Sequence, residues 1–181
     1  MDNTFNARHL DIRAFAQVGA ELRGQAPLAD WPRLASEQPP GEQVAGHQVH
    51  WRLQGGMVSV TGGEPRVGLR LWARADLSLQ CQRCLAPVVQ SLETERGFLF
   101  VADEATAEAL DEDSEEDVLV ISRDFDALSL VEDELILALP LVPRHDVCPQ
   151  ALPHAVADEA FTEATTRPNP FAALAALKKD T

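Results

Sequence analysis

The chain has 181 residues, 45% of them hydrophobic, and a formal net charge of −14. This length suffices for one domain with tails, and the composition allows a core to form. No segment approaches the roughly 18 consecutive apolar residues of a membrane-spanning helix, and the N-terminus lacks the basic and apolar regions of a secretory signal. We therefore expect a cytoplasmic protein that has no membrane partner.

The charge is divided unevenly along the sequence. Residues 1–100 hold ten acidic residues and ten arginines, whereas residues 101–181 hold 19 acidic residues against five basic ones. Such asymmetry is typical of an acidic arm on a neutral body. Because phosphates repel an acidic protein, a basic protein is a more natural direct partner for the acidic half than RNA.

The first forty residues favour helices. Apolar side chains recur at helical spacing over 8–23 and predict a helix there. Prolines at positions 27, 32, 39 and 40 break this pattern, and a second short helix is expected around 29–36.

From position 44 the apolar period changes to two and predicts antiparallel strands. Gly55-Gly56 is expected to form a hairpin turn, with strands around 49–53 and from Met57, and Gly62-Gly63-Glu64-Pro65 to form the next turn. Residues 67–79 are apolar at every second position, which predicts a strand with one buried face. After a turn at Cys81–Pro87, residues 88–101 are expected to return as another strand of a meander.

The second half contains an acidic segment and two further helical patterns. Residues 103–117 include nine acidic residues and no basic one, which fits either a docking arm for a basic partner or a solvated loop. A short strand is expected at 118–121 and a helix at 126–139, with Asp124 or Asp126 as its cap and Glu132, Asp133 and Glu134 on its exposed face. A short amphipathic helix is predicted from Asn169 to the C-terminus.

These elements predict an α+β fold. We expect an antiparallel β-meander sheet or partial barrel packed by one main helix, with peripheral N- and C-terminal helices. The predicted organisation is an N-terminal helical segment (1–43), an α+β core (44–148) with the acidic insert 103–117, and a C-terminal tail (149–181) that ends in a short helix.

The cysteines form the sharpest local pattern. Cys81 and Cys84 are two residues apart in a predicted turn, and His145 and Cys148 follow downstream with the same spacing. Two such pairs are typical of a closed, tetrahedral structural zinc site. Unmetallated thiols and a surface histidine remain an alternative. A thiol–disulfide centre is a third, less favoured alternative because no helix is predicted to begin at the first cysteine.

An arginine row is predicted on the polar face of the long strand. Arg66, Arg70 and Arg74 project from the same side, with Trp72 among them and Arg52 and Arg83 nearby. Such a row is a candidate contact for RNA or a partner, with Arg66, Arg70, Arg74 and Arg83 as its cations. The favoured alternative is cross-strand pairing with the acidic residues Glu93 and Glu95, together with ordinary packing of Trp72.

Catalytic patterns are lacking in the sequence. No serine lies in a Gly-x-Ser-x-Gly elbow, and neither a phosphate loop nor a dinucleotide fingerprint occurs. We therefore expect a binding protein with no small-molecule substrate. A thiol–disulfide oxidoreductase that uses Cys81 and Cys84 is the alternative.

Three segments together resemble one known family, the bacterial large ribosomal RNA subunit accumulation protein or YceD family. They are Leu79–Pro87 around the two cysteines, Leu128–Pro143 closed by His145 and Cys148, and Arg167–Ala172 near the C-terminus. The resemblance implies a non-enzymatic role in the synthesis, processing or stability of 23S ribosomal RNA and in large-subunit assembly. It implies ribosomal RNA or a basic large-subunit ribosomal protein as partner, and it carries over no catalytic residue.

Overall fold

The computed structural model describes residues 5–41, 46–59, 64–112 and 114–150. All helices and strands below belong to one compact unit, Met1–Val147, and only the first three residues of the second unit, Cys148–Thr181, are described. The C-terminal helix predicted from Asn169 lies outside the described residues. Among the described helices, none is both long and apolar enough to cross a membrane. The elements, in chain order, are α1 (Ile12–Gln17), β1 (Glu21–Pro27), η1 (Leu28–Asp30), α2 (Pro32–Ala35), β2 (Gln48–Val58), β3 (Arg66–Gln80), β4 (Pro87–Val101), α3 (Glu104–Asp111), β5 (Asp117–Val120) and α4 (Ala127–Leu137).

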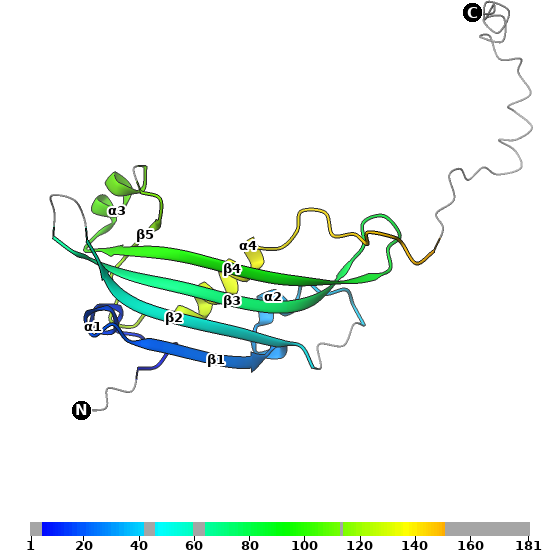
Figure 1. Cartoon of the computed structure of the whole chain (residues 1–181), viewed down its shortest axis with the longest axis horizontal. Coiled ribbons are helices and arrows are strands. Elements are labelled where there is room, and N and C mark those ends of the chain that lie inside the picture. The colour runs from blue at the N-terminus through cyan, green and yellow to red at the C-terminus, as the bar shows by residue number, and fades with distance from the viewer. Residues whose placement is uncertain (1–4, 42–45, 60–63, 113, 151–181) are drawn as a thin grey trace, which may run out of the picture. The chain divides into compact units, whose positions relative to one another are not determined.

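The predicted α+β class is confirmed. Five strands form one open sheet in the order β1-β2-β3-β4-β5, as Figure 1 shows. The first four strands are an antiparallel meander, whereas β5 pairs with β4 in parallel, so the sheet is mixed. Helix α3 occupies the connection between β4 and β5, which lets the chain return to run in the same direction.

The sheet has one covered and one open face. Alternate residues of β3, including Leu71, Ala73 and Leu77, are fully buried on the face that we call the helix face. Helices α1 and α4 pack against this face of the sheet, and α4 passes behind the strands in Figure 1. On the opposite face, which we call the open face, Arg70 and Arg74 are exposed and Trp72 is half-buried. The alternation that predicted a half-buried strand over 67–79 is therefore confirmed.

Two predictions for the first sixty residues are wrong. The helix expected over 8–23 ends at Gln17, and residues 21–27 form the edge strand β1. The hairpin turn expected at Gly55-Gly56 is instead the interior of the 11-residue strand β2. Gly55 is needed there because a Cβ atom would lie 2.6 Å from the ring of Phe15, so the glycine allows α1 to approach the sheet.

Two predictions for the second half also need correction. The acidic insert is not a plain loop, because α3 forms inside it with Asp103 as its cap: the Asp103 carboxylate accepts a hydrogen bond from the amide of Thr106 at 2.8 Å. Helix α4 begins after Asp126 as expected, but only part of its acidic face is exposed. The side chains of Glu132 and Glu134 are buried, since α2 and Arg96 of β4 supply their partners.

Candidate functional site

The turn between β3 and β4 holds two of the four predicted metal ligands. Cys81 is fully buried and Cys84 partly exposed. The amide of Leu85 donates to the carbonyl of Cys81 at 2.8 Å, and Leu85 adopts a positive φ of 61°. The turn is thereby tight enough for both thiols to face the same point. The amide of Gln82 donates to the carbonyl of Pro143 at 2.8 Å, which fastens the turn to the segment after α4.

His145 completes the cluster from that segment. Its Nδ1 lies 3.4 Å from Sγ of Cys84, and its backbone amide donates to Sγ of Cys81 at 3.5 Å. Its Nε2 lies 3.0 Å from the carbonyl of Pro87, an acceptor that requires the proton on Nε2. In the neutral imidazole this leaves the lone pair on Nδ1, the nitrogen that faces the Cys84 thiol.

The four predicted ligands come together. The ligand atoms of Cys81, Cys84, His145 and Cys148 all lie within 4.8 Å of one another, which is a group that could hold a metal ion. Burial of the Cys81 thiol disfavours its ionisation, but hydrogen bonds from the backbone of Cys84, His145 and Arg83 and from the Cys84 side chain lower its pKa from 9.0 to about 5. A thiolate held by amides inside a turn is the form in which cysteine binds a metal.

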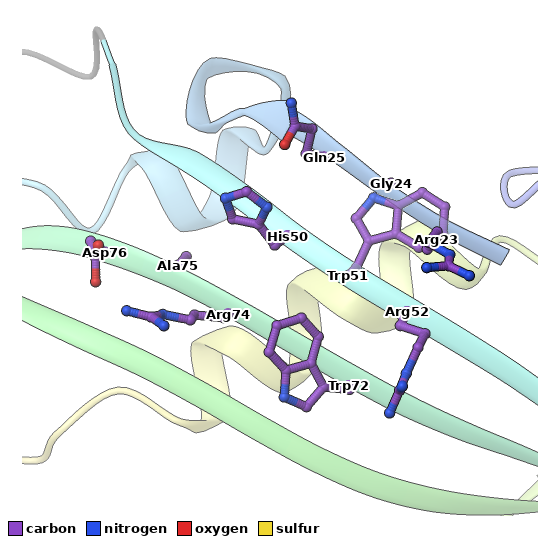
Figure 2. A pocket seen from close by; sticks show the side chains of 10 residues that line it. All are labelled: Arg23, Gly24, Gln25, His50, Trp51, Arg52, Trp72, Arg74, Ala75 and Asp76. Atoms are coloured by element: carbon purple, nitrogen blue, oxygen red, sulfur yellow. The ribbon is translucent and has the colours of Figure 1, made fainter.

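A groove of about 760 Å³ lies on the open face of the sheet. We call it the arginine groove, and Figure 2 shows its side chains on β1, β2 and β3 with helix ribbons behind them. Pairing on the open face places Arg23 opposite Arg52 and Arg52 opposite Trp72. The residues that line the groove are Arg23, Gly24, Gln25, His50, Trp51, Arg52, Trp72, Arg74, Ala75 and Asp76.

The predicted arginine row is only partly gathered in this groove. Arg74 lines it, and Arg66 and Arg70 lie further along the same face of β3. Arg70 forms an ion pair with Glu95 at 3.1 Å, as the cross-strand alternative expects. Arg83 lies instead in the turn between Cys81 and Cys84, apart from the row.

Sequence reasoning missed the contribution of β1 to this groove. Arg23 was placed at the end of the helix expected over 8–23, and Gln25 was placed after it. Nothing therefore indicated that both residues lie on a strand beside β2. A signal was present in the sequence, because apolar or small residues alternate with polar ones over 21–26. Leu22, Gly24 and Ala26 are the apolar or small members of that alternation.

Comparison with known proteins points to one family. The family described as "Large ribosomal RNA subunit accumulation protein YceD" matches residues 69–178, which is more than half of the chain. The chain belongs to this family. A curated relative named Large ribosomal RNA subunit accumulation protein YceD, from Haemophilus influenzae, is 42% identical over 106 residues. The aligned part covers 58% of this chain and spans 61% of the length of the relative. No solved structure gives a significant match.

The match to the YceD family covers the two candidate sites unequally. All four residues of the cysteine–histidine cluster lie inside residues 69–178. The groove residues Trp72 and Arg74 also lie inside it, whereas those on β1 and β2, such as Arg23 and Arg52, precede it. The cluster therefore lies wholly within the part of the chain that matches the family.

Proposed function

We propose that this chain promotes the accumulation of large-subunit ribosomal RNA, the 23S RNA of a bacterium, and thereby assembly of the large ribosomal subunit. The observation that carries the proposal is the family match over residues 69–178. The name of the relative from Haemophilus influenzae describes the same role. On this proposal the protein works in the cytoplasm, where ribosomes are assembled.

The protein acts by binding and not by catalysis. Its partners on this proposal are ribosomal RNA and a basic large-subunit ribosomal protein. The 19 acidic residues in the second half, nine of them within 103–117, support the protein partner, because opposite charge steers association. The arginine groove offers a surface of the opposite sign in the half of the chain that is neutral overall.

The rival function, thiol–disulfide exchange at Cys81 and Cys84, has less support. A low thiol pKa alone fits both exchange and metal binding, but exchange also requires that a partner reach the attacking sulfur. Cys81 has no exposed surface. The chain also runs from β3 through the turn into β4, so no helix begins at Cys81 to provide the usual thiolate stabilisation.

Zinc is the metal that the cluster fits best. Three thiolates and an imidazole are a donor set of structural zinc sites, which are tetrahedral and closed to solvent. The hydrogen bond from Nε2 of His145 to the carbonyl of Pro87 is the outer contact that orients a metal-bound histidine. A bound zinc would fasten the β3–β4 turn to the segment after α4.

Deletion of the gene tests the proposed function. We expect the amount of large-subunit ribosomal RNA, relative to that of the small subunit, to fall in the deletion strain and to recover when the wild-type chain is expressed. Sedimentation should place the protein with precursors of the large subunit. An unchanged ratio of the two RNAs after deletion would refute the proposal.

A further inference from the structure

Two neighbouring rows of side chains cross the open face and line the arginine groove. Residues paired across antiparallel strands project from the same face, and adjacent strands are about 4.8 Å apart. Residues two apart on one strand are separated by about 6.6 Å on the same face. Six side chains therefore form a compact grid. From β1 to β3, the rows are Arg23–Arg52–Trp72 and Gln25–His50–Arg74.

The charges within this grid do not complement one another. Arg23 lies directly opposite Arg52, and like charges in this position destabilise a sheet. Opposite charges do pair beside the grid, where Arg70 of β3 contacts Glu95 of β4. Opposite charges thus pair between β3 and β4, whereas two arginines face each other between β1 and β2. An anion bound between these two arginines would relieve their repulsion.

The arginines are also available to a ligand. In the described part of the chain, neither Arg52 nor Arg74 forms an ion pair or a side-chain hydrogen bond. Glu93 lies opposite Arg74 in register but accepts instead from Nε1 of Trp72 at 3.1 Å. Arg23 pairs only with Glu21 at 3.1 Å, and its side chain keeps 81% of its surface exposed, so this pair is weak.

We infer that the arginine groove binds single-stranded RNA, with phosphates on Arg23, Arg52 and Arg74 and an unstacked base on Trp72. The inference rests on the proposed function and names the ligand class of its RNA-binding surface. Trp72 is the cross-strand partner of Arg52 and lies two residues from Arg74 on β3, so a base on its ring would place the flanking phosphates near both guanidinium groups. Its indole N–H is already held by Glu93, which leaves the ring face for stacking.

The aromatic ring favours RNA over an acidic polypeptide. Carboxylates would satisfy the arginines, but they would leave Trp72 without a partner that uses its flat face. A base stacks on such a ring regardless of its identity, and only unpaired bases can do so. The acidic half of the chain opposes RNA at long range, so the affinity should be modest and strongly dependent on salt.

Fluorescence anisotropy with a labelled uridine oligomer of about ten nucleotides tests this directly. Three phosphate contacts predict that the logarithm of the affinity falls with the logarithm of salt concentration with a slope of about −2. The double variant Arg52→Gln/Arg74→Gln should bind about tenfold or more weakly, with a slope near −0.7. Trp72→Leu should weaken binding about tenfold while keeping the wild-type slope, because it removes stacking but no charge.

Controls separate this site from general electrostatics. Arg13→Gln removes an exposed arginine of α1 outside the groove and should bind RNA like the wild type. Thermal unfolding of the arginine variants should show no loss of Tm, because the substituted arginines make no contact that the fold needs. Equal loss on Arg13→Gln, equal affinity for duplex RNA, or equally effective competition by poly-glutamate would each overturn the inference.

Expression of the groove variants in the deletion strain distinguishes this inference from the proposed function. If RNA binding fails while the double variant restores large-subunit ribosomal RNA, the groove assignment is wrong and the proposed function stands. If the wild-type chain binds the oligomer but its gene deletion leaves ribosomal RNA unchanged, the groove stands and the proposed function is wrong.

Discussion

Protein groups alone fix the orientation of the His145 ring. Nε2 is held by the carbonyl of Pro87 at 3.0 Å, and the backbone amide of the same residue donates to Sγ of Cys81 at 3.5 Å. The residue is thus fixed at both its main chain and its side chain. A ligand fixed in advance loses little conformational freedom on binding, which favours a metal site that forms with the fold.

Substitution of one ligand tests the zinc proposal. Protein purified without chelator should contain about one zinc ion per chain, measured by atomic spectrometry. Cys84→Ser should lower this content several-fold, because a serine hydroxyl is a poor zinc ligand at neutral pH. It should also lower the Tm by several degrees, as should removal of the metal from the wild type by a chelator.

A second histidine provides the control for the metal measurement. His9→Gln changes an exposed histidine whose side chain pairs with the exposed Asp124, so zinc content and Tm should stay at the wild-type values. A wild-type chain that carries no metal and whose Tm ignores chelators would contradict the zinc proposal.

Glu134 has an unfavourable environment for a charge. Burial raises its pKa above 4.5; Arg96, 3.7 Å away, lowers it, and Asp117 and Asp133 raise it. The folded state therefore holds this proton more tightly than the unfolded state. Its contribution to stability is full below the unfolded pKa and is lost as the pH rises through the raised pKa.

Glu134→Gln should remove the loss of stability that accompanies ionisation of this carboxyl. We expect the free energy of unfolding of the variant to equal or exceed that of the wild type at pH 7, since Arg96 keeps Asp117 as a partner at 2.7 Å. The difference should shrink toward zero as the pH falls below 4.5, where the wild-type carboxyl is protonated in both states. Urea unfolding at several pH values measures this, with Glu108→Gln as a control for a change of charge. If the free energy of unfolding of the variant, compared with that of the wild type, were lower at pH 7 than at pH 4, the predicted direction of the Glu134 effect would be contradicted.

At the scale of elements, helix α2 depends on a residue from α4 for its cap. Pro32 is its first residue, and no side chain of its own N-cap accepts a hydrogen bond. The buried carboxylate of Glu132 accepts instead from the amides of Arg33 and Leu34, at 2.8 and 3.1 Å. An acid at a helix start also interacts favourably with the helix dipole. This contact explains why an acidic residue of α4 is buried.

Glu132→Ala should therefore destabilise the fold by about 2 kcal/mol or more, because the buried amide of Leu34, the part-buried amide of Arg33 and the Arg33 guanidinium lose an acceptor. The neighbouring Asp133 also pairs with Arg33, but on the surface, so Asp133→Asn should cost less than about 1 kcal/mol. Urea unfolding compares the two variants. Equal costs would show that the capping contact is not what Glu132 provides.

The strands that sequence reasoning identified are those whose periodicity matches their burial. Strand β3 is confirmed because strict alternation over 67–79 is typical of a half-buried strand alone. Strand β4 is confirmed because the turn expected at Cys81–Pro87 returns the chain along β3. Strand β1 was missed because Leu22 also falls at helical spacing from Val18, and local periodicity cannot exclude a helix there. Gly55-Gly56 was misassigned because a glycine that admits Phe15 looks like a glycine that makes a turn.

The candidate sites differ in predictability for the same reason. Close spacing in the sequence predicted the pairs Cys81–Cys84 and His145–Cys148. That the two pairs lie together could be confirmed only from the fold. The arginine groove needs three strands in register, so its grid could not be predicted once β1 was lost. Burial of Glu132 was equally hidden, since its partners lie 98 and 99 residues away.

For the whole molecule, the division of charge gives one surface that favours anions and another that favours cations. The groove presents arginines from the neutral half, whereas α3 presents exposed carboxylates, including those of Glu108, Asp111 and Glu112 near its C-terminal end. Helix C-terminal ends disfavour negative charge, and the last turn of α3 has no basic residue to offset it. The acidic end of α3 is therefore not explained by the stability of that helix.

A triple variant, Glu108→Gln/Asp111→Asn/Glu112→Gln, tests what these charges do. It leaves Asp103 in place, whose pKa is lowered by the hydrogen bond from the Thr106 amide that caps α3, so the helix should persist. If the acidic half binds a basic ribosomal protein, affinity for large-subunit precursors should fall about tenfold at low salt and converge with the wild type at high salt. Binding of the uridine oligomer should instead strengthen slightly, because less negative charge repels it. The decisive result is that the two affinities change in opposite directions. A loss of both affinities would mean that the carboxylates support the fold. No change in either affinity would mean that they keep the protein soluble without docking a partner.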